Sequence, residues 1–390
     1  MTDSRQLFCI LMREFLLHLP RSAWGDIRRL VTLAWAVVGL CLSKTVSLSS
    51  WGETVESRAK QAASHARRFQ RWVDNAHVRV QALYAPLVRA ALVDWKPTGR
   101  VYVALDVSVL KGSPFVLIRV SLIYRGRALP LAWSVLRHAS ATVGYSGYAP
   151  VLEQALACLP PGLDVVFLAD RGFVHAELFQ WLQLQHWHFR IRLTGDTLIH
   201  LSNRQVVSVG ALVPPKGAAH FYHHVRLLGI AFGPCHLALA QLDEPNQDPW
   251  FLVSDEPTDL QTFDEYGLRF DLEENFLDDK SNGFQVEASR LDTPAALERL
   301  FLVLAVATLH LTSVGVEVVQ RKLRHWVDTH WDRGMSYLKI GWSWLRQQHR
   351  RRWPTLRTFW LDPAPDPEPA VASRRQATQP KPKWAVVFKT

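Results

Sequence analysis

The sequence predicts an α/β protein with a central mixed β-sheet, a β-rich insertion in that sheet, and helices before and after it. Three observations predict this class. Apolar residues recur at helical spacing in the first part of the chain, β-rich runs begin at Arg100, and helix and strand patterns alternate after Tyr148. With 390 residues, 48% of them hydrophobic, the chain can form two or three domains with a sizeable core.

The chain is basic, with a formal net charge of +10 and a pI near 9.6. This charge predicts a polyanionic partner, either nucleic acid or an acidic membrane surface. The apolar run Leu30–Leu42 is shorter than the roughly 20 residues that cross a bilayer, so we expect a buried helix and no membrane partner. No signal-peptide pattern is found, and the four cysteines lack metal-type spacing, so we expect a cytoplasmic protein.

The N-terminal part is predicted to be helical. Residues 4–20 and 22–42 show helical periodicity, and residues 43–55 are typical of a polar turn. The helix predicted at residues 56–75 has a basic polar side, which includes Arg67, Arg68 and Arg71. Such a helix can face a phosphate backbone or can simply be solvated. Its position beside two apolar helices favours a DNA-binding domain.

From Arg100 onward the periodicity becomes that of strands. Three β-rich runs are separated by glycine-containing turns, and helices and strands then alternate. In chain order these are strands at 100–110, 113–126 and 127–137, a helix at 148–160, a strand at 163–173, a helix at 175–185, and a strand at 188–195. This order is that of ribonuclease H-like domains.

Between Asp196 and Trp250 the pattern is one of strands without strong helices, which predicts an insertion within the same domain. The run 293–319 is apolar enough to be a buried helix, and the proline-rich end predicts a disordered tail. The expected divisions are a helical DNA-binding domain (1–96), a core in two parts (97–193 and 253–319), the insertion (194–252), a helical C-terminal region for DNA or dimer contacts (320–361), and the tail (362–390).

Two aspartates interrupt apolar strands. Asp106 lies inside "VYVALDVSVL", and Asp170 follows the apolar run "VVFLA". A lone buried carboxylate is costly unless it is paired or bound to a cation, and the carboxyl ends of strands are where sites form in open α/β sheets. One such aspartate could equally cap the following helix. Two of them on strands of one sheet favour a site.

The segment "EYGLRFDLEENFLDDK", Glu265–Lys280, mixes acids with groups that bind phosphate. A solvated helix is the simplest alternative. On a single helix, successive residues advance by about 100°, so Arg269, Glu273 and Lys280 share one face, with Tyr266 at its edge. This predicts a metal-binding carboxylate between two phosphate-binding cations.

The opposite side of that helix carries Phe270 and Phe276, which we expect to pack against the sheet. Glu274 is an alternative ligand, which the helical face argues against. Two aspartates and one glutamate suit Mg²⁺, with Mn²⁺ as a substitute, and two such ions about 4 Å apart can promote phosphodiester chemistry. No Cys/His cluster or phosphate-binding glycine loop is found, so neither zinc nor a nucleotide cofactor is expected.

Tyr266, Arg269, Glu273 and Lys280 meet the spacing Y-x(2)-R-x(3)-E-x(6)-K. With the aspartates of "LDVS" and "ADRGF" upstream, the chain resembles the DDE transposases of bacterial insertion sequences. The match, over roughly residues 100–319, is to the cut-and-paste branch with a β-strand insertion before the catalytic glutamate. Some relatives carry a further basic residue where this chain has Leu277.

The resemblance implies a ribonuclease H-like core in which Asp106, Asp170 and Glu273 are the catalytic, metal-binding residues. It implies Mg²⁺-dependent cleavage at transposon ends, followed by strand transfer by the freed 3′-hydroxyl. Tyr266, Arg269 and Lys280 would hold the DNA strand. The expected partners are double-stranded DNA, as transposon ends and target, and a second copy of the chain in the DNA complex. We therefore expect the protein to be associated with the nucleoid.

Two aromatic features leave alternatives open. Trp250, on the last strand of the insertion, is a core residue by composition, but the resemblance places a DNA-contacting tryptophan here that stacks on a base turned out of a hairpin. The basic run His349–Pro354 either binds DNA or follows a helix that packs Trp342 and Leu345 into the core. A repressor that binds DNA without cleaving it, and a nuclease that never joins strands, are the alternative functions.

Overall fold

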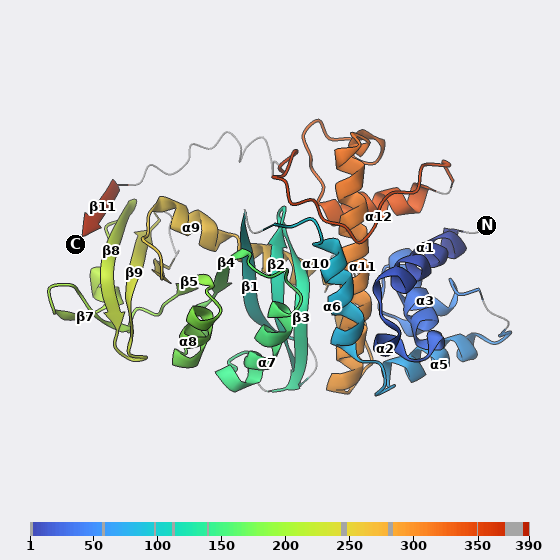
Figure 1. The fold of residues 1–390 in the computed structure, drawn as a ribbon, viewed down its shortest axis with the longest axis horizontal. Helices are drawn as coiled ribbons and strands as arrows, with labels where there is room; N and C mark the ends of the chain where they lie inside the picture. Colours follow the sequence, from blue (N-terminus) through green and yellow to red (C-terminus); the bar gives the residue numbers. More distant parts are fainter. Residues whose placement is uncertain are drawn as a thin grey trace.

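A mixed β-sheet runs through much of the molecule, and helices pack against it (Figure 1). The computed structural model describes residues 3–56, 59–96, 99–110, 114–138, 140–242, 248–279, 284–348, 350–370 and 385–389. Its strands follow the order β3-β2-β1-β4-β5-β10-β9-β8-β6-β7, and β11 pairs with β8. The predicted α/β class with a mixed sheet is therefore confirmed.

The strands that come first along the chain form one half of the sheet. β1 pairs antiparallel with β2, and β2 with β3, whereas β1, β4 and β5 are mutually parallel neighbours. These strands are mostly buried on both faces, which explains their nearly continuous apolar sequences. Their bounds, with those of the two connecting helices, are β1 (Arg100–Val109), β2 (Phe115–Tyr124), β3 (Arg127–Arg137), α7 (Tyr145–Leu156), β4 (Asp164–Ala169), α8 (Ala176–Leu184) and β5 (His188–Arg192).

The predicted insertion extends this sheet. β10 pairs antiparallel with β5 on one side and with β9 on the other, so backbone hydrogen bonding continues from the core strands into the insertion. The insertion strands are β6 (Leu198–His200), β7 (Val206–Ser208), β8 (Ala218–Leu227), β9 (Phe232–Gln241) and β10 (Trp250–Ser254), with a short 3₁₀ turn, η2 (Val209–Leu212).

The N-terminal part is helical, as predicted, but it is divided differently. The single helix expected at residues 22–42 is two helices, because Gly25 has a φ of 61° and Asp26 caps the next helix by accepting a hydrogen bond from Arg28 N–H at 2.9 Å. The turn expected at residues 43–55 contains a short helix. The helices are α1 (Asp3–His18), α2 (Arg21–Trp24), α3 (Ile27–Ser43), α4 (Leu48–Gly52), α5 (Ala62–Val73) and α6 (Val80–Ala91).

The 27-residue helix α11 (Pro294–Gln320) joins the parts of the molecule. It packs against β3, against the N-terminal helices α3, α5 and α6, and against α12 (Tyr337–Gln348) (Figure 1). Among the described residues, α11 is the one helix long and apolar enough to cross a bilayer, but its most apolar stretch is wholly buried inside the protein. The buried helices expected at 293–319 and at Leu30–Leu42 are both confirmed.

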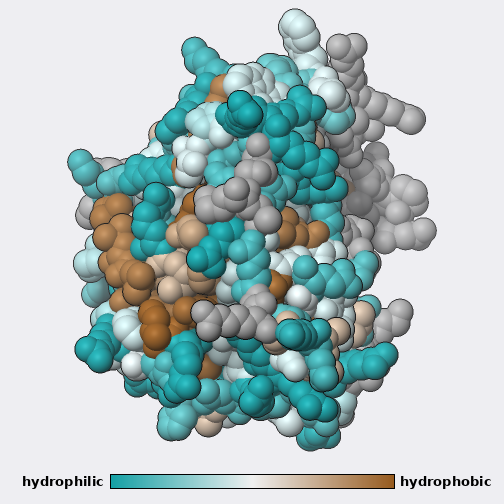
Figure 2. All heavy atoms as spheres, turned by 90° about the vertical axis from the view of Figure 1, so that its right-hand side faces the viewer, coloured by the Kyte–Doolittle hydropathy of each residue, from teal (hydrophilic) through white to brown (hydrophobic). Residues whose placement is uncertain are grey.

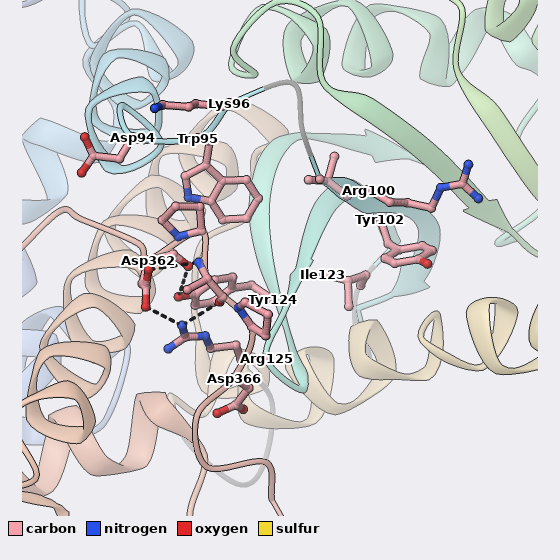
Figure 3. A pocket seen from close by; sticks show the side chains of 15 residues that line it. Asp94, Trp95, Lys96, Arg100, Tyr102, Ile123, Tyr124, Arg125, Asp362 and Asp366 are labelled. Atoms are coloured by element: carbon pink, nitrogen blue, oxygen red, sulfur yellow. Dashed lines mark hydrogen bonds and ion pairs between the residues drawn. The ribbon is translucent and has the colours of Figure 1, made fainter.

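The tail was predicted to be disordered, but its described parts are ordered. β11 (Ala385–Lys389) pairs parallel with β8. Upstream, the Arg125 guanidinium donates to the Asp362 carboxylate at 2.9 Å, beside a hollow of about 640 Å³ (Figure 3). Asp366 also accepts from Arg333 at 2.9 Å. Ion pairs with buried arginines therefore hold residues that composition alone assigns to a disordered tail.

The end of the molecule that carries the N-terminal helices is largely hydrophilic, and its largest hydrophobic area lies at the lower left of the view (Figure 2). Exposed large apolar side chains on these helices include Leu16 and Leu17 of α1. A mostly polar surface at this end is compatible with a charged partner.

Candidate active site

The parallel register of β1 and β4 brings the two aspartates to neighbouring strands. Leu105 of β1 pairs with Ala169 of β4, and Asp106 and Asp170 are the residues that follow these two in the chain. Asp106 lies within β1, and Asp170 directly follows β4, where it leads into a 3₁₀ turn (Arg171–Phe173). Both aspartates therefore lie toward the carboxyl ends of two adjacent parallel strands.

The single helix expected from Tyr266 to Lys280 is two helices in the structure. α9 (Leu260–Gly267) ends before Arg269, and α10 (Phe270–Asp279) follows it. At the junction between the two helices the backbone hydrogen bonds are of the 3₁₀ type, from residue i+3 to residue i. One example is the bond from Arg269 N–H to the Tyr266 carbonyl at 3.0 Å. Gly267 has a low helix propensity, and this tighter turn directs Arg269 inward. Lys280 lies outside the described residues.

Arg269 connects the two sides of the site. Its Nη1 lies 3.2 Å from Asp106 Oδ2, and its Nη2 lies 2.8 Å from Glu273 Oε1. The arginine is 5% exposed, whereas the Glu273 side chain is 51% exposed. The guanidinium therefore neutralises a buried strand acid and a more exposed helix acid together.

Tyr266 completes the cluster from α9. Its hydroxyl donates a long hydrogen bond, 3.5 Å, to Asp170 Oδ1. Burial raises the pKa of Tyr266 to about 12, so the phenol keeps its proton at neutral pH. Contacts therefore link Tyr266 to Asp170, and Arg269 to both Asp106 and Glu273.

Asp106 is the acid with the most perturbed environment. Burial raises its pKa above the ordinary value, and the negative charges of Glu273 and Asp170 add to the rise. The Arg269 guanidinium and the Val107 N–H, which donates to Asp106 Oδ1 at 2.8 Å, oppose it. A further positive charge near Asp106 would thus be favourable.

The donor set fits a hard divalent cation in chemistry, because Asp106, Asp170 and Glu273 offer only carboxylate oxygens. In the described residues, however, no three such side chains are gathered closely enough to hold a metal ion. One oxygen each of Asp106 and Glu273 is held by Arg269. In this arrangement the Arg269 guanidinium compensates part of the negative charge of two of the three acids.

The helix that carries Glu273 is anchored at its end by an ion pair that sequence reasoning missed. Arg119, the cross-strand partner of Asp106 on β2, lies 2.6 Å from Asp279 at the end of α10, and both side chains are at most 5% exposed. The Arg119 guanidinium also stacks on Phe276 at 4.9 Å. The available signal was an arginine inside the apolar run "FVLIRVSLIY".

The two phenylalanines of α10 differ from each other. Phe276 packs inward, as predicted. Phe270 is 39% exposed, and its ring lies near those of Tyr266 and of Trp250 on strand β10, so it packs only partly against the sheet. Both residues lie on α10, where six residues at about 100° each place them roughly 120° apart around the helix, so their rings face different neighbours.

Trp250 is half-buried beside this cluster. Its ring meets that of Tyr266 edge-on at 5.5 Å and lies 6.1 Å from that of Phe270. The insertion strand β10 therefore carries a partly accessible aromatic side chain next to the residue that contacts Asp170. Both alternatives for Trp250, core residue and base-stacking residue, are compatible with this position.

The basic residues of α5 do not share one role. Arg67 and Arg71 are exposed, whereas Arg68 turns inward and its Nε donates to Thr32 Oγ1 of α3 at 3.3 Å. Burial lowers the pKa of Arg68. Arg68 therefore joins two helices, and its role as a DNA contact stays a prediction.

The tryptophans of α12 pack inward. Trp342 is 5% exposed and donates from Nε1 to the Cys41 carbonyl at 2.6 Å. Trp353, in the basic run, lies 4.5 Å from Trp344. Arg350, Arg351 and Arg352 are exposed. The core alternative therefore holds for the tryptophans, while the arginines still face solvent.

No family model and no curated protein matches this sequence. Among solved structures, the chain is similar to a piggyBac transposase in a synaptic complex with hairpin DNA, with 11% sequence identity and a TM-score of 0.42. The similarity covers 94% of this chain and 87% of that one. At this level of similarity, the function of this chain has to be argued from its own residues.

Proposed function

We propose that the protein is a DNA transposase of the DDE type from a bacterial insertion sequence, with a ribonuclease H-like core, acting on DNA in the cytoplasm. One observation carries the proposal. Tyr266, Arg269 and Glu273, which meet the spacing of that family, contact or lie beside the aspartates that precede them in the family order. If the segment were only a solvated helix, contacts of Tyr266 with Asp170 and of Arg269 with Asp106 would not be expected.

In this proposal Asp106, Asp170 and Glu273 hold Mg²⁺, for which Mn²⁺ can substitute. The metal supplies charge stabilisation at the phosphodiester and activation of the attacking water or hydroxyl. The burial of Asp106 near Asp170 and Glu273 supports a cation there, because buried negative charges are costly unless positive charge compensates them. Arg269 and Tyr266 would position the DNA strand, and a DNA phosphate would compete with the two acids for the arginine.

The proposed substrates are double-stranded DNA ends and a target duplex, with two copies of the chain in the complex. Exposed arginines at Arg67 and Arg71 support duplex binding from the N-terminal helices. Lys280 is proposed as a second strand contact from the family spacing.

The amide variants Asp106→Asn, Asp170→Asn and Glu273→Gln test the proposal. Each should abolish Mg²⁺-dependent cleavage of a linear duplex carrying the DNA that flanks the coding region, while binding of that duplex persists. Glu274→Gln is the matched control and should cleave normally. If Glu273→Gln cleaves and Glu274→Gln does not, Glu274 is the ligand instead of Glu273.

Two further readouts separate the alternative functions. Added Mg²⁺ should raise the Tm of the wild-type protein and leave that of Asp106→Asn unchanged, which reports metal binding without activity. Joining of a cleaved 3′ end to a plasmid distinguishes a transposase from a nuclease. A wild-type protein that binds the duplex but never cleaves it with Mg²⁺ or Mn²⁺ would be a repressor instead.

A further inference from the structure

A polar hollow of about 450 Å³ lies between the N-terminal helices and the segment that leads from α10 to α11. We call it the α5 hollow. Arg67 and Gln70 of α5 line it from the N-terminal side, together with Ser47 and Ser49 at the start of α4. Ser289 and Arg290 line it from the other side.

The two sides of the α5 hollow are held together by backbone and helix packing. Val46 N–H donates to the Phe284 carbonyl at 3.1 Å, which ties the segment before α4 to the segment after α10. α5 also packs on α11, which begins just after Arg290 with Thr293 as its N-cap. The two sides of the hollow are therefore held together by the fold.

The charged side chains that line the α5 hollow are all positive. Its lining includes two arginines and no aspartate or glutamate, although Glu287 and Asp292 stand close by in sequence. Arg67 and Arg290 are exposed, and within the described part of the chain neither guanidinium has a hydrogen bond or ion pair. Two free guanidinium groups beside three serine hydroxyls form a recognition set for phosphate oxygens.

We propose that the α5 hollow binds a backbone phosphate of duplex DNA. The inference rests on the proposed function for the identity of the polymer. Arg71 is exposed one helical turn beyond Arg67, so cationic side chains continue past the hollow along α5. A polymer with repeated phosphates can use both positions, whereas a free anion can use only the hollow.

This contact would connect DNA binding to the proposed active site through the chain itself. Arg290 belongs to the segment that directly follows α10, the helix that carries Glu273. A duplex held between Arg67 and Arg290 is therefore held by the N-terminal helices and by the proposed catalytic core together. The α5 hollow would thus set where along the duplex the site acts.

The test measures binding of a short linear duplex of arbitrary sequence by the full chain, as a function of salt. The variants are Arg67→Ala, Arg290→Ala and their combination. Arg21→Ala is the control, because Arg21 is exposed on α2 and lies outside the hollow. We expect the double variant to bind about tenfold more weakly at low salt than the control. Its log Kd against log salt should be shallower by about 0.9 for each DNA phosphate that the variant no longer neutralises.

The double variant Arg67→Lys/Arg290→Lys should keep most of the salt slope, because lysine also supplies charge to phosphate. Equal affinity and slope for the double alanine variant and the control would overturn the proposal, while cleavage by wild type would leave the proposed function standing. Loss of inorganic phosphate binding without loss of duplex binding would assign the hollow to a free anion instead. A wild-type protein that binds no duplex would end both proposals.

Discussion

At the scale of single residues, two acids of the candidate site, Asp106 and Glu273, pair with the same guanidinium, that of Arg269. The buried Arg269 holds Asp106 and Glu273 at hydrogen-bond distance, so its charge partly neutralises each acid. Burial and the neighbouring acids nevertheless keep the pKa of Asp106 raised. The residues are thus arranged to accept additional positive charge, and the strand of DNA proposed to bind here would bring a phosphate for Arg269.

A second perturbed residue, His310, lies far from this chemistry in the middle of α11. Its ring is fully buried, and neither ring nitrogen has a hydrogen-bond partner in the described residues. Burial lowers the pKa of His310 to about 4. The folded protein therefore keeps this imidazole neutral, whereas the unfolded chain protonates it near the ordinary value of about 6.5.

His310→Leu should consequently change the acid side of the stability profile. Above pH about 6.5 the imidazole is neutral in both the folded and the unfolded chain, so it does not affect the free energy of unfolding. As the pH drops from about 6.5 toward about 4, only the unfolded chain binds the proton, and the free energy of unfolding falls. This group accounts for up to about 3 kcal/mol of that loss. Urea unfolding across this pH range should show a flatter profile for His310→Leu. His77→Leu, an exposed control, should keep the wild-type loss, and an unchanged slope in His310→Leu would contradict the assignment.

At the scale of elements, the buried Arg119–Asp279 pair anchors α10 to the sheet. The pair connects the end of α10 to β2, directly across from Asp106. Because β1 and β2 are neighbouring strands, the same register that places Asp106 also places the anchor of the helix that carries Glu273. The geometry of the site thus depends on the paired positions Asp106 on β1 and Arg119 on β2.

Asp279→Ala should lower the free energy of unfolding by about 3–5 kcal/mol, because it leaves the Arg119 charge buried without this carboxylate. Combining Arg119→Met with Asp279→Leu should recover most of that loss, since apolar replacements of a buried pair are often neutral. Denaturant unfolding of the three proteins measures both effects. A single variant as stable as wild type would show that the pair does not anchor α10.

The contact between α11 and α12 depends on two glycines. A Cβ at Gly315 would collide with the Tyr337 carbonyl, and a Cβ at Gly341 would collide with the Leu311 carbonyl. Gly315→Ala must separate the helices and should destabilise the protein by about 1–3 kcal/mol. Gly229→Ala is the control, because a Cβ there meets nothing within 4 Å. Thermal unfolding compares them, and equal Tm values would rule out the close approach.

At the scale of the whole molecule, one continuous sheet connects the core to the insertion and brings a distant strand to the site. β10 lies between β5 and β9, so Trp250 comes to the edge of the acid cluster without any long loop. α11 and the N-terminal helices close the other end of the molecule (Figure 1). Residues far apart in sequence therefore meet at the candidate site.

Trp250→Ala should leave first-strand nicking intact but weaken formation or opening of a terminal hairpin. The proposed cause is loss of a stacking surface for a base turned out of the duplex, worth about 1–3 kcal/mol. A fluorescent base analogue at the terminal position reports extrusion. Trp250→Phe is the control and should retain much of it. Unchanged extrusion in a folded Trp250→Ala protein would assign this tryptophan to packing against Tyr266 and Phe270.

The sequence by itself determined the features that depend on local periodicity. The strands around Asp106 and Asp170, the buried helix α11 and the helical N-terminal part all follow from apolar spacing, which is a property of neighbouring residues. The two acids could also be found, because a carboxylate inside an apolar strand is costly unless something compensates it.

Only the tertiary structure decided which partners compensate those charges. The break between α9 and α10 that directs Arg269 to two acids, the inward turn of Arg68, and the pairing of Arg119 with Asp279 all depend on contacts between segments far apart in sequence. Local periodicity is silent on them, because an arginine on a helix has the same spacing whether it faces solvent, another helix or a buried carboxylate. The free energy that selects among these states comes from burial and charge pairing, which exist only once the sheet and helices have packed.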